Sequence, residues 1–260
     1  MSWLNWKLTT EYDGRPFCGW QRQPRARSVQ GELEKALSII RRETIGVVGA
    51  GRTDAGVHAA GQVAHFKSAE PLEPHRLRWQ LNGVLPDEII VTEIKLVPDD
   101  FHARFSATAR TYSYFILNRP SPSPFRRHHS WWIAKDFDIE AARRAAAFLV
   151  GVHDFAAFTV AKDGPTVRDV RGIDVFLESD ALTFGAVSRE EAGLGLIRLR
   201  ITANAFLHHM VRLIVGTLAE VAVGKRTPDS VAKILTGGDV RATGARAPAK
   251  GLWLERVDYD

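Results

Sequence analysis

An arginine and an aspartate stand two residues apart in a stretch of small residues, GAGRTDAGVHAAGQVAHF, at 49–66. A carboxylate beside a guanidinium stays ionised even where water is excluded, because the cation stabilises the charged form. An ionised carboxylate can act as a nucleophile or as a base, and the glycines and alanines around Asp54 would let a bulky substrate approach. The spacing by itself favours a structural role, in which an ion pair between Arg52 and Asp54 fixes a turn.

Other chemistries fit this stretch less well. A P-loop needs a lysine after its glycines, and a dinucleotide fingerprint needs a strand that leads into a helix; neither pattern is present. Asp54, His58 and His65 could bind a metal, as in a metal-dependent hydrolase, but the zinc-binding motifs are absent and Cys18 is the single cysteine. A glycosidase would need a second carboxylate, and the nearest acidic residues in the sequence lie outside the loop. The sequence motifs therefore favour neither a metal site nor a nucleotide-binding loop at this stretch.

Hydrophobic periodicity predicts the elements that position this loop. Alternation indicates strands at 4–14, 45–50, 61–68, 88–97, 111–118, 171–179, 181–187, 194–203 and 251–259. Helical spacing indicates helices at 28–43, 74–85, 138–151, 204–224 and 228–238, the first of them with Ser28 as its N-cap. Many strands follow one another without an intervening helix, so the sequence predicts an α+β architecture with mostly antiparallel sheets.

The pattern breaks around 98–110, which we interpret as the boundary between two halves, 1–105 and 106–260. Each half shows strand, helix and paired strands in roughly the same order. This order hints at an internal duplication, although no residue-level repeat supports it. The first half carries Asp54.

Composition sets the broad class. The chain has 260 residues, 45% of them hydrophobic and 25% charged, which is typical of a globular protein with one large domain or two smaller ones. No apolar run is long enough to cross a membrane and the first ten residues form no apolar signal segment, so we expect a cytoplasmic protein.

Arginine provides most of the positive charge. The net charge is +5, and arginines cluster at 19–27, 124–129 and 240–250. The planar guanidinium suits phosphate recognition, but arginine also coats many protein surfaces. Charge alone leaves both interpretations open.

The stretch at 49–66 resembles the central motif of the A-type tRNA pseudouridine synthases. Segments 12–24, 28–37, 101–116, 204–216 and 247–259 also resemble that family in the same order, so the similarity covers nearly the whole chain. One departure is Leu213, where a polar residue would be expected. The resemblance implies the pseudouridine synthase fold, in which two similar α/β halves surround a central catalytic cleft.

The resemblance also implies an activity. These enzymes convert uridine to pseudouridine at positions 38–40 of the tRNA anticodon stem-loop, without a cofactor or metal, and act as homodimers. Asp54 matches the catalytic aspartate of the family, either as the nucleophile at C1′ or as a base toward the ribose. Arg52 would orient Asp54 and hold open the space that the displaced base leaves.

Two residues of the second half match the uracil pocket of the family. Tyr112 would stack on the target base, and Leu252 would line the far side of the pocket. Without the resemblance both would be assigned to core packing, and Tyr114 and Phe115 would be equal candidates for the stacking role. His58 and Arg212 are expected near the cleft without an assigned role. A non-catalytic RNA-binding protein on the same scaffold is the nearest alternative.

Overall fold

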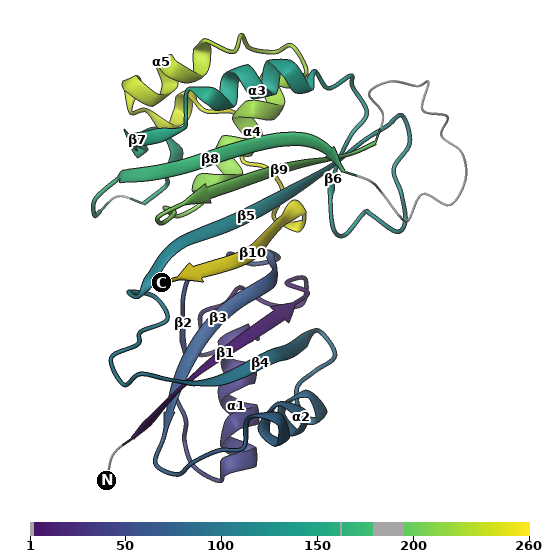
Figure 1. Cartoon of the computed structure of the whole chain (residues 1–260). Helices are drawn as coiled ribbons and strands as arrows, with labels where there is room; N and C mark the ends of the chain where they lie inside the picture. Colours follow the sequence, from purple (N-terminus) through teal and green to yellow (C-terminus); the bar gives the residue numbers. More distant parts are fainter. Residues whose placement is uncertain (1–2, 162, 179–194) are drawn as a thin grey trace. The chain divides into compact units, whose positions relative to one another are not determined.

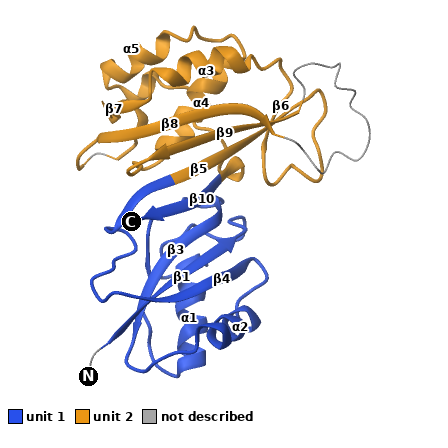
Figure 2. Ribbon diagram, in the orientation of Figure 1, with its two compact units in different colours: residues 1–110, 253–260 blue, residues 111–252 orange. Residues whose placement is uncertain are grey.

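The computed structural model describes residues 3–161, 163–178 and 195–260. It divides the chain into two units (Figure 2): residues 1–110 with 253–260 form the first, and residues 111–252 form the second. The chain passes from the first unit to the second within strand β5 (Ala107–Asn118) and returns with strand β10 (Leu252–Tyr259).

The first unit combines a sheet with two helices (Figure 1). Its other elements are β1 (Leu4–Tyr12), α1 (Val29–Arg41), β2 (Val48–Gly49), β3 (His58–Ser68), α2 (Pro74–Val84) and β4 (Ile89–Val97). The strands follow the order β4-β1-β3-β10, and β2 pairs with β3. Strand β1 is antiparallel to both of its neighbours, whereas β10 is parallel to β3. Because β1 lies between two strands, the residues at its end are fixed from both sides.

Local sequence signals explain the two helices of this unit. The Ser28 hydroxyl accepts a hydrogen bond from the amide of Gly31, which caps α1 as predicted. The apolar residues Val29, Leu33 and Leu37 recur at helical spacing and are buried. Helix α2 begins with proline at its first position, after a Glu73 side chain that accepts from two backbone amides.

The second unit places three helices together on one side of its sheet (Figure 1). After β5 the elements are β6 (Trp131–Ile133), α3 (Ile139–Ala147), β7 (Gly151–Asp154), β8 (Val167–Glu178), β9 (Gly195–Ala203), α4 (Met210–Ala222) and α5 (Ser230–Gly237). The strands follow the order β5-β9-β8-β7, and β6 runs parallel to β5. Strand β8 is antiparallel to both of its neighbours, β7 and β9. The α+β class and the mostly antiparallel pairing are therefore as predicted.

Several predicted boundaries differ from the structure. The helix expected at 204–224 begins only at Met210, because the Asn204 side chain accepts hydrogen bonds from backbone amides and His209 adopts a left-handed conformation with φ of 64°. Only Val48–Gly49 of the strand expected at 45–50 pairs in the sheet. The strand expected at 181–187 lies outside the described residues.

Among the described residues, no helix combines the length and apolarity that a bilayer crossing requires.

Candidate active site

Asp54 lies in the loop that joins β2 to β3. The amide of Val57 donates to the Asp54 carbonyl at 3.1 Å, which closes a turn directly after the aspartate. Thr53 is buried, Asp54 is half-buried and Arg52 is exposed. The carboxylate therefore stands at the border between the core of the first unit and its surface.

The backbone of residues 12–20 packs against this loop. The amide of Trp20 donates to the Thr53 carbonyl at 3.1 Å. Gly19 has φ of +106°, and a Cβ there would lie 2.6 Å from the Thr53 carbonyl oxygen. A Cβ on Gly14 would lie 2.0 Å from the carbonyl oxygen of Val57. Glycine is required at both positions because the two backbones touch directly.

Buried side chains hold the same loop from beneath. The Tyr12 hydroxyl and Thr53 Oγ1 are 2.8 Å apart and both are buried, and Gln62 Nε2 donates to the Gly51 carbonyl at 3.0 Å. Burial raises the pKa of Tyr12 to about 12, although hydrogen bonds with Thr53 and Gln62 oppose the rise. The Tyr12 hydroxyl is therefore protonated throughout the neutral pH range.

The ion pair expected between Arg52 and Asp54 is not formed. In the part of the chain that the structure describes, the Arg52 guanidinium has no hydrogen bond and no ion pair. An exposed pair gains little over the separately hydrated groups, so the turn is fixed by Thr53 and the 12–20 segment instead. Arg52 and Asp54 share the loop, but Arg52 does not orient Asp54 in this structure.

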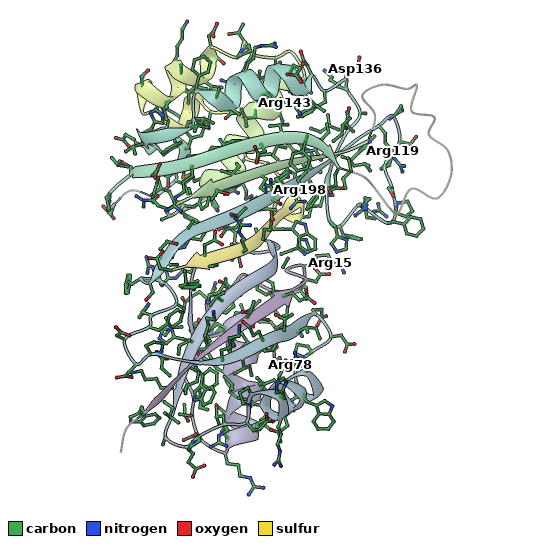
Figure 3. All side chains as sticks on the ribbon, viewed as in Figure 1. Arg15, Arg78, Arg119, Asp136, Arg143 and Arg198 are labelled. Carbon is green, nitrogen blue, oxygen red and sulfur yellow. The ribbon has the colours of Figure 1, made fainter. Side chains whose placement is uncertain are left out.

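His58 lies at the start of β3 and is fully buried. Its Nδ1 is 3.2 Å from both the Gly14 amide and Asp13 Oδ1, and it can accept from the first or donate to the second, but not both. Burial raises the pKa of Asp13, but hydrogen bonds from Arg15 (labelled in Figure 3) and the nearby His58 lower it to about 2. We interpret His58 as a residue that holds the 13–14 turn in place.

The structure separates the aromatic candidates on β5. Tyr114 is fully buried, and its hydroxyl donates to the Pro248 carbonyl at 2.8 Å, so it is a core residue. The Phe115 ring lies under the Arg198 guanidinium, 5.5 Å from its centroid. Tyr112 is 8% exposed and meets Phe206 edge to face, with centroids 5.1 Å apart.

Leu252 is buried in the second unit, where β10 begins. Its backbone amide donates to the Ala249 carbonyl and ends a short 3₁₀ turn. Tyr112 and Leu252 thus belong to one unit, whereas Asp54 and Arg52 belong to the other.

Helix α4 contains both Arg212 and the unexpected Leu213. Arg212 Nε donates to the Ala247 carbonyl at 2.8 Å, and the Ala247 amide donates back to the Arg212 carbonyl at 3.0 Å. The Leu213 side chain is buried, so its apolar character suits the helix core. Arg212 fixes the segment that leads into β10.

Several arginines of the predicted basic segments already have acidic partners. Arg22 pairs with Glu34 at 3.0 Å, and Arg27 pairs with Glu32 at 2.9 Å. Arg25 and Arg127 are exposed and have no carboxylate partner among the described residues. Only such unpaired guanidinium groups can bind phosphate without first breaking an ion pair.

Sequence reasoning did not single out Arg198 on β9, which is labelled in Figure 3. Its Nε donates to Ser113 Oγ at 2.9 Å, and its guanidinium lies over the rings of Phe115 and Phe176. The signal was present as the alternation of arginine with apolar residues along LIRLRITA at 196–203. The alternation places Arg198 and Arg200 on the same face of the sheet.

Comparison with known proteins gives a consistent result. A family model described as tRNA pseudouridine synthase matches residues 8–106 and 145–260. The chain is 40% identical over 258 residues to the tRNA pseudouridine synthase A of Bacillus subtilis (strain 168), with 98% of each chain covered. It is 42% identical over 255 residues to the protein of that name from Syntrophotalea carbinolica, with 97% of this chain and 95% of the relative covered.

Proposed function

The chain belongs to the tRNA pseudouridine synthase family, and from this premise we propose that it isomerises uridine to pseudouridine at positions 38–40 of the tRNA anticodon stem-loop. As a member of the family it is an isomerase that acts in tRNA processing. The positions within tRNA rest on the resemblance of the motif around Asp54.

The reaction rearranges one nucleotide without a net change in composition. The bond between ribose C1′ and uracil N1 breaks, the base turns, and C1′ bonds to uracil C5. The proton on C5 leaves and N1 gains one, so no oxidant, reductant or second substrate is consumed. What the chain must supply is a carboxylate near the ribose and a pocket that holds the detached base. The target base must also flip out of its stack to reach them.

Asp54 is the residue that we propose to act on the ribose, as nucleophile at C1′ or as base. The observation that carries this proposal is the construction of its loop. The Thr53 carbonyl accepts a hydrogen bond from the Trp20 amide and the Val57 backbone touches Gly14, while Asp54 between them is half-buried, at the surface of the unit. A fixed carboxylate that a substrate can reach is the requirement for an aligned attack.

Three further residues have proposed roles toward the flipped base. Tyr112 stacks on the uracil and assists proton removal at C5, and Leu252 provides an apolar wall. Arg52, whose guanidinium has no partner among the described residues, helps hold open the space that the base leaves and contacts RNA phosphate. Because Arg52 does not pair with Asp54, its role is assigned toward RNA rather than toward the carboxylate.

The proposed assembly is a cytoplasmic homodimer in which one tRNA contacts both subunits. The unpaired Arg25 and Arg127 are the candidates for phosphate contacts. Static light scattering at micromolar concentration tests the dimer, because a monomeric mass there would contradict it.

The direct test of the activity is to map pseudouridine in an unmodified tRNA transcript after incubation with the purified chain. We expect new pseudouridine confined to positions 38–40. Binding of the transcript without any pseudouridine would contradict the proposal and favour a non-catalytic RNA-binding protein. A requirement for added divalent metal, beyond its effect on tRNA folding, would favour a metal-dependent reaction.

A further inference from the structure

We propose that Tyr12 is a positioning residue for Asp54, which acts through its hydrogen bond to Thr53. This inference rests on the proposed role of Asp54. It assigns a function to a residue on the central strand β1 that does not itself touch the substrate.

The contact fixes the residue directly before the aspartate. The Tyr12 hydroxyl and Thr53 Oγ1 are 2.8 Å apart, and the exposed fractions of the two residues are 3% and 6%. The Thr53 carbonyl accepts a second hydrogen bond, from the amide of Trp20. Thr53 is therefore bound through both its side chain and its backbone, and rotation about the bonds that lead to Asp54 is restricted.

Tyr12 is itself held in place by the sheet. It pairs with Ala59 of β3 on one side and with Ile89 of β4 on the other. The Gly14 backbone, two residues later, touches Val57 on the far side of the turn. Residues 12–14 thus contact the loop on both sides of Asp54, at Thr53 and at Val57. The contact with Thr53 is made by the Tyr12 side chain.

The hydroxyl is suited to this role because it does not change its charge. Burial keeps Tyr12 protonated at neutral pH. The hydrogen bond therefore persists across the neutral pH range, and its removal should affect turnover equally across that range. Misplacement of a reacting group by about 1 Å can lower the rate by about a hundredfold.

The test compares Tyr12→Phe and Thr53→Val, which remove the hydrogen bond from opposite sides with little change in shape. Steady-state kcat and KM for a tRNA transcript are measured at pH 6.5, 7.5 and 8.5, together with the melting temperature. Thr53→Ser keeps the hydroxyl and serves as the conservative variant. Asp54→Asn is measured in the same assay.

A matched control is available in the same unit. The Tyr259 hydroxyl donates to the Ala103 carbonyl at 2.7 Å, so Tyr259→Phe also removes one tyrosine hydrogen bond. We expect Tyr12→Phe and Thr53→Val each to lower kcat about 10- to 100-fold at unchanged KM and by the same factor at each pH. Thr53→Ser and Tyr259→Phe should stay within about twofold of the unchanged chain, although Tyr259→Phe should lower the melting temperature as much as Tyr12→Phe does.

The double variant Tyr12→Phe/Thr53→Val should lose no more activity than Tyr12→Phe alone, because that single variant has already lost the hydroxyl that bonds Thr53. The inference is overturned if Tyr12→Phe turns over as fast as Tyr259→Phe, or if the two losses multiply in the double variant. If Tyr12→Phe does not fold, the kcat of Thr53→Val is compared with that of Thr53→Ser. Equal values would overturn the inference. An active Asp54→Asn would instead refute the proposed function, on which the positioning role depends.

Discussion

The imidazole of His58 stacks on the indole of Trp253, with ring centroids 4.4 Å apart and ring planes inclined by 17°. The two residues are far apart in the sequence but pair directly across the parallel strands β3 and β10. The stack joins the strand that follows the Asp54 loop to the last strand of the chain.

Replacement of Asp54 by asparagine should abolish turnover and leave binding intact. Asparagine keeps the size of the side chain but loses its charge and its nucleophilicity, so kcat should fall by roughly 10³-fold or more. The tRNA dissociation constant, measured by filter binding, should stay within about threefold, because phosphate contacts elsewhere dominate affinity. The exposed Asp100→Asn is the matched control and should change neither quantity. Near-normal turnover in Asp54→Asn would remove Asp54 from the mechanism.

Two substitutions of Tyr112 separate stacking from proton transfer. Tyr112→Phe keeps the ring, whose stacking is worth roughly 1–3 kcal/mol per base, so tRNA binding should persist while turnover falls. Tyr112→Leu removes ring and hydroxyl and should lose turnover entirely. The control is Tyr114→Phe, which should cost about 1 kcal/mol of stability through the lost bond to Pro248 and leave turnover unchanged. Full activity in both Tyr112 variants would identify it as a core residue.

A pair of glycine substitutions tests the packing beneath the Asp54 turn. Gly19→Ala places a Cβ 2.6 Å from the Thr53 carbonyl at a φ of +106°, so unfolding free energy should fall by about 2 kcal/mol or more, and turnover should fall with it. Gly83→Ala lies within α2 with no atom near its new methyl group, and should stabilise the chain by up to about 1 kcal/mol. Urea denaturation measures both. Equal stability of the two variants would show that the 12–20 segment can move away from the loop.

His65 should make stability depend on pH in the mildly acidic range. Burial, followed by the charges of His102 and Lys67, lowers its pKa from 6.5 to about 4. The unfolded chain therefore binds more protons than the folded chain between these values, so stability is lost as the pH falls from about 6.5 toward about 4. His65 Nδ1 also accepts from the Ala103 amide, which requires the neutral ring.

The measurement is the unfolding free energy at pH 7 and pH 5 for the unchanged chain and for His65→Asn. The unchanged chain should lose about 1–2 kcal/mol more over this interval than the variant. Parallel pH curves for the two proteins would show that another group causes the acid sensitivity.

Unpaired arginines should contribute to RNA affinity more than paired ones. Arg25→Ala should weaken tRNA binding and reduce the slope of log K against log salt by about 0.7–0.9, the value for one phosphate contact. Arg27→Ala should have a smaller effect on this slope, because Glu32 and Glu88 already neutralise that guanidinium. Titrations between about 50 and 200 mM salt measure both slopes. Identical slopes for the two variants would place Arg25 outside the RNA interface.

Features encoded by neighbouring residues could be predicted from the sequence. Helix α1 was predicted because its cap and its apolar stripe lie within one short segment. The predicted start of α4 was too early, because Leu207 continues the apolar spacing toward the N-terminus. In the structure, the hydrogen bonds of Asn204 and the left-handed backbone of His209 keep the residues before Met210 out of the helix. Hydrophobic periodicity does not register either of those local conformations.

The loop with Asp54 could be found from its motif, but what holds it could not. The expected pair with Arg52 was inferred from spacing, and the exposed guanidinium forms no such pair among the described residues. The actual support, Tyr12 against Thr53, joins residues 41 positions apart and depends on the register between β1 and β3. Side-chain alternation indicates which residues share a face, but it does not fix that register. The catalytic assignment of Asp54 itself stays a prediction.

The return of β10 to the first unit has a consequence for synthesis on the ribosome. Residues 253–260 are translated after the whole second unit, yet they pair with β3, the strand that begins just after the Asp54 loop. During translation the start of β3 therefore lacks its β10 partner while more than half of the chain is still being made. A nascent chain that stalls in the second unit would expose that strand edge to chaperones or to neighbouring chains.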